Sequence, residues 1–252
     1  MKYKAIITDL DRTLLKDDKT VSEYTINVLH ELKRQRIKFF INTARILPTA
    51  KVYFNQLDSD AMAFSNGAGI VCKDGNQERF LMDYQKGYDV LQQIVNSFPG
   101  IDISVMTPDK MYTNYKALFV EQLSEIMNFP QNPIERIMIK NGGKHVYNFI
   151  LQNPANVRQY DIRLIEERDI VITDKVANKL YAMKYILKYY QLKPEQIIGF
   201  GDDSSDIDFL KQCGISVAVG NAKQEIRKVC MYVTLDNEND GVGKWIEKNV
   251  LL

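Results

Sequence analysis

The first strand that the sequence predicts ends in two carboxylates. Residues 3–8 form an almost uninterrupted apolar run with few turn-forming residues, and Asp9 and Asp11 follow it two positions apart. Such a run is typical of a strand that is buried on both faces of a parallel sheet. Open α/β folds place their chemistry at the carboxyl edge of that sheet. This stretch therefore favours the α/β class and predicts two acids at the functional edge.

Strands and helices alternate through the first third of the chain. An amphipathic helix is expected over residues 21–36 with Ser22 as its N-cap, between the first strand and a second strand over 38–41. A third strand, over 61–65, runs into Asn66 and Gly67, for which a turn and a substrate contact are equally good interpretations. The order strand, helix, strand, helix, strand predicts a parallel sheet.

The pattern changes from about residue 84. A helix over 88–97 and a hairpin over 162–173 indicate a separate α+β unit with an antiparallel sheet. The alternation then returns, with expected helices at 177–190, 205–212 and 223–229 and expected strands at 196–200 and 215–219. The sequence therefore predicts a parallel-sheet core domain formed by residues 1–82 and 179–252, with an α+β cap domain inserted at 83–178.

Charge and cysteine content exclude several classes of protein. Lysine and arginine total 33 against 32 acidic residues, so the net charge of +1 argues against a nucleic-acid or membrane partner. The three cysteines have no paired spacing, which predicts neither a disulfide framework nor a zinc site. No signal peptide or spanning apolar segment is evident, so a cytoplasmic location is expected. Oligomeric state is left open.

Polar residues with complementary chemistry fall at the ends of the predicted core strands or at the starts of the helices that follow. They are Asp9 with Asp11, Thr43, Lys179, and Asp202 with Asp206. Acids gathered from distant parts of the chain repel one another unless a cation lies among them, which implies Mg²⁺. A carboxylate beside such an ion, with a lysine and a hydroxyl nearby, suits phosphoryl transfer through an aspartyl-phosphate. A second carboxyl group two residues on can serve as acid and then as base.

At these motifs the chain resembles the haloacid dehalogenase-like (HAD) hydrolases, and within them the Cof-type phosphatases, which carry a large α+β (type IIB) cap in a Rossmann-like core. Residues 9–15 resemble the first motif, Asp-x-Asp-x-Thr, which implies Asp9 as nucleophile and Asp11 as general acid/base. Thr43 and Lys179 resemble the second and third motifs, which bind the phosphoryl group. Residues 201–206 resemble the fourth.

The resemblance also implies a ligand set and supporting residues. Mg²⁺ is expected on the side chains of Asp9 and Asp202 and on the backbone carbonyl of Asp11. Asp206 is expected to support the site, although a favourable interaction with its helix dipole is the alternative. Residues 217–222, which include Asn221, and 239–242 resemble later stretches of the Cof-type group.

Three positions depart from the family pattern. Arg12 stands where relatives usually have glycine, Ala44 replaces the glycine of Thr-Gly-Arg, and Ser205 replaces an asparagine that contacts the phosphoryl group. Ser205 is shorter than asparagine, so a bridging water would be needed for the same contact. Arg12 is interpreted as a solvated side chain rather than as a substrate contact.

The function predicted is a magnesium-dependent phosphatase for a small phosphorylated metabolite, such as a sugar phosphate or a cofactor phosphate, with substrate selection by the cap. A phosphosugar mutase of the same fold and a catalytically silent regulator that binds a phosphometabolite are the alternatives. Lys175 and Lys184 are alternatives to Lys179 as the lysine of the third motif. His30 and His145 are expected to be structural or exposed.

Overall fold

The computed structural model describes residues 3–117 and 120–251, and the chain divides into two compact units. The core unit comprises Met1–Glu78 and Lys179–Leu252, and the insert unit comprises Arg79–Asn178. The first boundary lies before the expected division after residue 82. The reason is that Met82 belongs to the insert unit, where its backbone exchanges hydrogen bonds of 2.8 and 2.9 Å with Ile134.

The core unit is built on an eight-stranded sheet with the order β14-β13-β12-β1-β2-β3-β4-β5. Neighbouring strands from β14 to β3 are parallel, and β4 runs antiparallel to β3. All four residues of β1 are buried, in agreement with its apolar sequence. The strands are β1 (Ala5–Thr8), β2 (Lys38–Asn42), β3 (Ala61–Phe64), β4 (Gly69–Cys72), β5 (Gln77–Arg79), β12 (Ile197–Gly201), β13 (Ile215–Ala218) and β14 (Tyr232–Val233).

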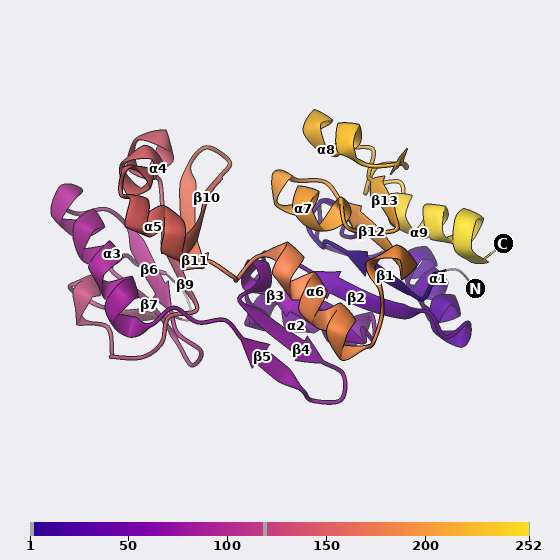
Figure 1. Ribbon diagram of the computed structural model, residues 1–252, viewed down its shortest axis with the longest axis horizontal. Helices are drawn as coiled ribbons and strands as arrows, with labels where there is room; N and C mark the ends of the chain where they lie inside the picture. The colour runs from indigo at the N-terminus through magenta and orange to yellow at the C-terminus, as the bar shows by residue number, and fades with distance from the viewer. Residues whose placement is uncertain (1–2, 118–119, 252) are drawn as a thin grey trace. The chain divides into compact units, whose positions relative to one another are not determined.

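Helices pack against this sheet and against one another, and Figure 1 shows α6 lying along it. Contacts join α1 to α9 and β2, α6 to α7 and to β2, β3 and β4, and α7 to β12 and β13. The α-helices are α1 (Glu23–Arg34), α2 (Leu47–Gln56), α6 (Lys179–Tyr189), α7 (Ile207–Leu210), α8 (Gln224–Val229) and α9 (Gly241–Ile246). Short helices are η1 (Ser65–Gly67), η3 (Pro194–Gln196), η4 (Ser204–Asp206) and the π-helix η5 (Glu247–Leu251). The predicted α/β class with a parallel core sheet is thereby confirmed.

Two predicted helices need correction. Helix α1 begins at Glu23, where the Ser22 hydroxyl caps it as expected by accepting from Thr25 N at 3.1 Å, and it ends at Arg34, two residues before the expected end. The single helix expected over 205–212 is instead a 3₁₀ turn, η4, followed by the four-residue α7. The Asp206 side chain accepts hydrogen bonds from the backbone of the preceding loop, and this local pairing tightens the first turn.

The insert unit has a six-stranded sheet with the order β10-β11-β9-β6-β7-β8. Its pairs are antiparallel except for β7 with β8, and the predicted hairpin is β10 with β11. Figure 1 shows α3, α4 and α5 together on one face of this sheet. The strands are β6 (Ile103–Met106), β7 (Met111–Thr113), β8 (Glu121–Gln122), β9 (Arg136–Ile139), β10 (Tyr160–Ile165) and β11 (Asp169–Asp174), and the helices are α3 (Tyr84–Ser97), η2 (Ile126–Asn128), α4 (Gly143–Gln152) and α5 (Pro154–Gln159).

A single apolar core fills the space between these helices and the sheet. Val90, Ile137 and Ile172 are among its buried members. Met106 and Tyr112 of the insert unit are buried, whereas Met138 and Tyr115 are only half-buried. Within the described part of the chain, no helix combines the length and the apolar character that a bilayer crossing requires.

Candidate active site

The candidate site lies at the carboxyl ends of neighbouring strands in the core sheet. Asp9 follows β1 and Asp202 follows β12, and the two strands pair in parallel with Thr8 opposite Phe200. On the other side of β1, β2 ends next to Thr43. Parallel strands in register deliver the residues that follow them to one edge of the sheet. The topology therefore gathers residues that are far apart in the sequence.

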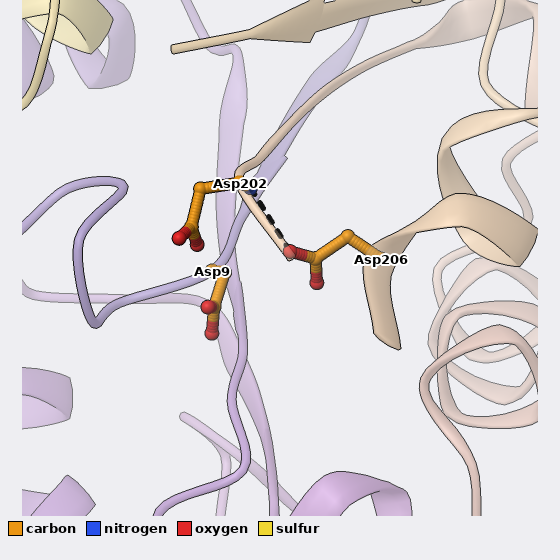
Figure 2. Close-up of side chains that lie close together, drawn as sticks. All are labelled: Asp9, Asp202 and Asp206. Atoms are coloured by element: carbon orange, nitrogen blue, oxygen red, sulfur yellow. Dashed lines mark hydrogen bonds between the residues drawn. The ribbon is translucent and has the colours of Figure 1, made fainter. Parts of the chain in front are cut away.

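Three acids form a tight buried cluster at this edge. One carboxylate oxygen each from Asp9, Asp202 and Asp206 lies within 4.8 Å of the others. Figure 2 shows these three side chains lying close together. Asp206 is fully buried, and its Oδ2 accepts from the backbone N–H groups of Asp202 and Asp203, both at 3.1 Å. Asp206 thus fixes the backbone that carries Asp202.

Lys179 places a positive charge among these acids. Its side chain is 1% exposed, and its Nζ lies 3.0 Å from Asp9 Oδ1 and 2.6 Å from Asp206 Oδ1. Burial alone would lower the pKa of Lys179, but the charges of Asp206 and Asp9 raise it above its ordinary value. The competing lysines lie elsewhere: Lys175 donates to the carbonyl of Val157 at 2.9 Å, and Lys184 is exposed. Of the three lysines considered, the structure brings only Lys179 into the cluster.

The two strand-end acids have elevated pKa values. Burial, with repulsion from the neighbouring acids and despite Lys179, raises the pKa of Asp9 to about 8. Burial, together with the charge of Asp206, raises that of Asp202 to about 6. A nearby cation would favour the ionised form of both groups.

The donor set at the cluster fits a hard divalent cation. Asp9 Oδ1 accepts from Lys179 and Asp202 Oδ1 accepts from Thr13 Oγ1 at 2.9 Å. The other oxygen of each carboxylate has no hydrogen-bond partner within residues 3–117 and 120–251. Oxygen atoms of this kind are the ligands that Mg²⁺ prefers. Asp206 is less suited to bind the ion, since both of its oxygens already accept hydrogen bonds.

Thr13 and Thr43 are the buried hydroxyls of the site. Thr13 belongs to the first motif, and its hydroxyl donates to Asp202 and so orients a residue of the fourth motif. Thr43 is 1% exposed, and its Oγ1 accepts from the backbone N–H of Arg45 at 3.2 Å. This bond leaves the Thr43 hydroxyl hydrogen free to be donated to a bound group.

Asp11 lies outside the acid cluster. Its carboxylate accepts from Arg45 Nε at 2.6 Å and from Arg45 Nη2 at 2.7 Å, and Lys19 Nζ lies 3.0 Å from Oδ1. Burial would raise the pKa of Asp11, but the hydrogen bonds from Arg45 and Lys19 lower it below its ordinary value. Sequence reasoning missed both cations. The arginine of the Asn-Thr-Ala-Arg stretch was the signal available for Arg45.

The remaining expected residues lie around the loop after β1. Asn221 donates to the Arg12 carbonyl at 2.7 Å and accepts from Asn237 N at 3.0 Å, so it ties this loop to the C-terminal part of the core unit. Arg12 is exposed and has a φ of 58°, a left-handed conformation that glycine adopts without steric cost. This explains why glycine is usual there. Ser205 is half-buried within η4.

The expected turn at Asn66 and the two histidines also have clear positions. Asn66 is buried in η1 with a φ of 60°, and its N–H donates to the Thr43 carbonyl at 3.0 Å. It therefore braces the loop after β2. His30 and His145 are both exposed, and the ring of His145 packs edge-on against Phe98.

The whole chain is similar to a known family of hydrolases. The sequence model of the family described as haloacid dehalogenase-like hydrolase matches residues 6–246. The chain belongs to this family. The resemblance drawn from its motifs is thereby confirmed, including the inserted α+β cap that accompanies the parallel core in Cof-type members.

Curated relatives of the chain are named as phosphatases. A 5-amino-6-(5-phospho-D-ribitylamino)uracil phosphatase, YitU, from Bacillus subtilis is 28% identical over 96% of this chain and 96% of its own. Phosphoglycolate phosphatase 1 from Saccharolobus solfataricus is 24% identical over 97% of this chain and 95% of its own. A solved haloacid dehalogenase-like hydrolase from Bacteroides thetaiotaomicron shares the fold, with a TM-score of 0.86 at 20% identity, covering 98% of this chain and 99% of its own.

Proposed function

We propose that this member of the haloacid dehalogenase-like hydrolases is a magnesium-dependent phosphoric monoester hydrolase that acts on a small phosphorylated metabolite. The observation that carries the proposal is the pair of free carboxylate oxygens on Asp9 and Asp202 beside the buried ammonium of Lys179. This is an arrangement for binding a cation and a phosphoryl group together. The phosphatase names of relatives that align along almost the whole chain support the same class of reaction.

In this proposal Asp9 is the nucleophile. Its carboxylate attacks phosphorus, the bond from phosphorus to the leaving oxygen breaks, and Asp11 gives that oxygen a proton. Because Arg45 and Lys19 lower the pKa of Asp11, this carboxyl group must take up a proton before the first step. The product of this step is an aspartyl-phosphate on Asp9 and the free alcohol. Asp11 then takes a proton from water as the water attacks phosphorus, which releases inorganic phosphate and restores both carboxyl groups.

Other residues of the core unit stabilise charge. Lys179 Nζ, already 3.0 Å from Asp9, and the free hydroxyl hydrogen of Thr43 are placed to interact with the phosphoryl oxygens. The side chains of Asp9 and Asp202 and the backbone carbonyl of Asp11 would hold Mg²⁺. When bound, the ion offsets the negative charge of the acids and of the phosphoryl group. Asp206 supports Asp202 and Lys179 through its hydrogen bonds.

Phosphate release is the direct test. Purified protein is assayed with 4-nitrophenyl phosphate and with a panel of phosphorylated metabolites that includes 2-phosphoglycolate, in Mg²⁺ and in EDTA. We expect release that requires Mg²⁺ and is lost in Asp9→Asn, with Asp208→Asn, an exposed acid on α7, as the matched control. Undiminished turnover by Asp9→Asn would exclude the nucleophile. An isomerised sugar phosphate with little free phosphate would indicate the mutase, and saturable binding without release would indicate the regulator.

A further inference from the structure

The guanidinium group of Arg45 forms a bidentate salt bridge with the Asp11 carboxylate; its planar pair of donors is called the fork below. Its Nε and Nη2 donate to the two different oxygens of the Asp11 carboxylate, at 2.6 and 2.7 Å. The Arg45 side chain is 19% exposed, whereas that of Asp11 is 37% exposed. A guanidinium that binds both oxygens of a carboxylate fixes the plane of that carboxylate as well as its position. Among the described residues, the other charged group that contacts the Asp11 carboxylate is Lys19, whose Nζ lies 3.0 Å from Oδ1.

Both the guanidinium group and the backbone of Arg45 have contacts that hold them in place. The guanidinium carbon lies 4.9 Å from the centre of the Tyr53 ring, which it overlies. The backbone around it is anchored by the bond from Arg45 N to Thr43 Oγ1 and by the bond of 2.6 Å from Ser65 N to Arg45 O. Arg45 is therefore a rigid element that joins the loop after β2 to the loop after β1.

The same network distinguishes the two oxygens of Asp11. Oδ1 receives a second contact from Lys19 Nζ at 3.0 Å, and the Tyr53 hydroxyl steadies Lys19 by donating to its carbonyl at 2.9 Å. Oδ2 accepts only from Arg45 Nε among the described residues. A carboxylate oxygen has two lone-pair directions. One direction on Oδ2 is therefore left available.

We propose that Arg45 is a positioning residue which directs the Oδ2 atom of Asp11 toward the oxygen that gains or loses a proton. This rests on the proposed function, in which Asp11 is the general acid/base. In the first step the proton moves from Asp11 Oδ2 to the leaving oxygen, and in the second it moves from water to Oδ2. Arg45 acts through Asp11 and does not bind the phosphoryl group.

A leaving-group series tests this role. The value of kcat/KM is measured for phenyl phosphate, whose leaving group needs protonation, and for 4-nitrophenyl phosphate, whose leaving group needs it little. We expect Arg45→Gln to lower kcat/KM about 10-fold to 100-fold for phenyl phosphate, with little change in KM, because the acid is misplaced. For 4-nitrophenyl phosphate the loss should stay within about 3-fold. In an Asp11→Asn background, Arg45→Gln should cause no further loss with either substrate.

Two further variants separate the explanations. Arg45→Lys keeps the charge but not the fork, so it should not restore kcat/KM. Arg34→Gln, which removes an exposed pair with Glu31, is the matched control and should retain the wild-type value. Overall folding is checked by the thermal transition of the fluorescence of the single tryptophan, Trp245.

The outcomes are distinct. A loss that is equal for both substrates and persists in the Asp11→Asn background would assign Arg45 to substrate binding and overturn the proposal, as would full activity of Arg45→Lys. If the wild-type protein released phosphate from no substrate, the proposed function would fail. A high-resolution crystal structure of Arg45→Gln would then still decide the inference: displacement of the Asp11 carboxyl group supports it, and an unchanged Asp11 overturns it.

Discussion

Replacement of Lys179 by methionine tests whether its ammonium group is what allows the acid cluster to be buried. Methionine is unbranched and similar in length, so it fills the same space without the charge. The change leaves Asp9 and Asp206 buried close together, with no positive group between them. Both activity and stability should therefore fall.

The structure sets the size of the effect. Lys179 makes two ion pairs, at 3.0 and 2.6 Å, and its side chain is 1% exposed. Removal of one partner from a buried charge pair costs about 3–5 kcal/mol, because the other partner stays buried without its counter-charge. Asp9, whose pKa is about 8 even beside Lys179, takes up a proton when the ammonium group is removed. We therefore expect the free energy of unfolding to fall by about 3 kcal/mol, the lower end of that range, at pH 8 in EDTA.

Urea unfolding followed by tryptophan fluorescence reports on the core unit, which contains Lys179. The single tryptophan, Trp245, is buried in α9 of the core unit and contacts Phe200 of β12 edge-on. Lys184→Met is the matched control, since Lys184 lies on the same helix but is exposed, and it should change the free energy of unfolding by less than about 0.5 kcal/mol. A loss below about 1 kcal/mol in Lys179→Met would refute the argument that this lysine neutralises the cluster.

Three further changes have defined outcomes. The pKa of Asp9 is about 8 in the folded protein and 3.8 ordinarily, so between these pH values the folded protein binds one proton more than the unfolded chain. In EDTA, the free energy of unfolding should therefore fall as the pH rises from 3.8 to about 8. Urea titrations of Asp9→Asn should show a flatter slope. Gly201→Ala would place its Cβ 2.7 Å from Asp206 Cβ, and displacement of Asp206 should lower the free energy of unfolding by about 1–3 kcal/mol in the same assay. Arg12→Gly should raise it by about 0.5–1 kcal/mol, because the left-handed φ of 58° no longer costs energy, and a fall in turnover of about 10-fold would instead assign Arg12 to substrate binding.

The sequence was most informative where apolar runs end in polar residues. β1 and β12 are buried strands whose position in a parallel sheet follows from their composition, so the nearness of Asp9 and Asp202 could be expected. The helix α6 was also expected, and Lys179 begins it. The short strand β5 was missed because Gln77–Arg79 contains no apolar residue, and its pairing comes from its neighbour in the sheet.

The environment of Asp11 could not be predicted from spacing. Its direction depends on the loop after β1, in which Arg12 takes a left-handed φ, and on Arg45, which arrives from a different loop. Neither conformation leaves a periodic signal. The same limit applies to η4, where the hydrogen bonds that Asp206 accepts from the backbone N–H groups of Asp202 and Asp203 outweigh the pattern that predicted one continuous helix.

The place of β1 in the sheet order has a consequence for how the protein is made on the ribosome. β1 is among the first segments to be synthesised, yet one of its two neighbours, β12, begins only at Ile197. Until then one edge of β1 has no partner strand, and Asp9 has no ammonium beside it before residue 179 is added. A nascent chain is therefore exposed to wrong strand pairing throughout synthesis of the insert unit. Chaperone binding to nascent chains should be strongest for those that end before Ile197.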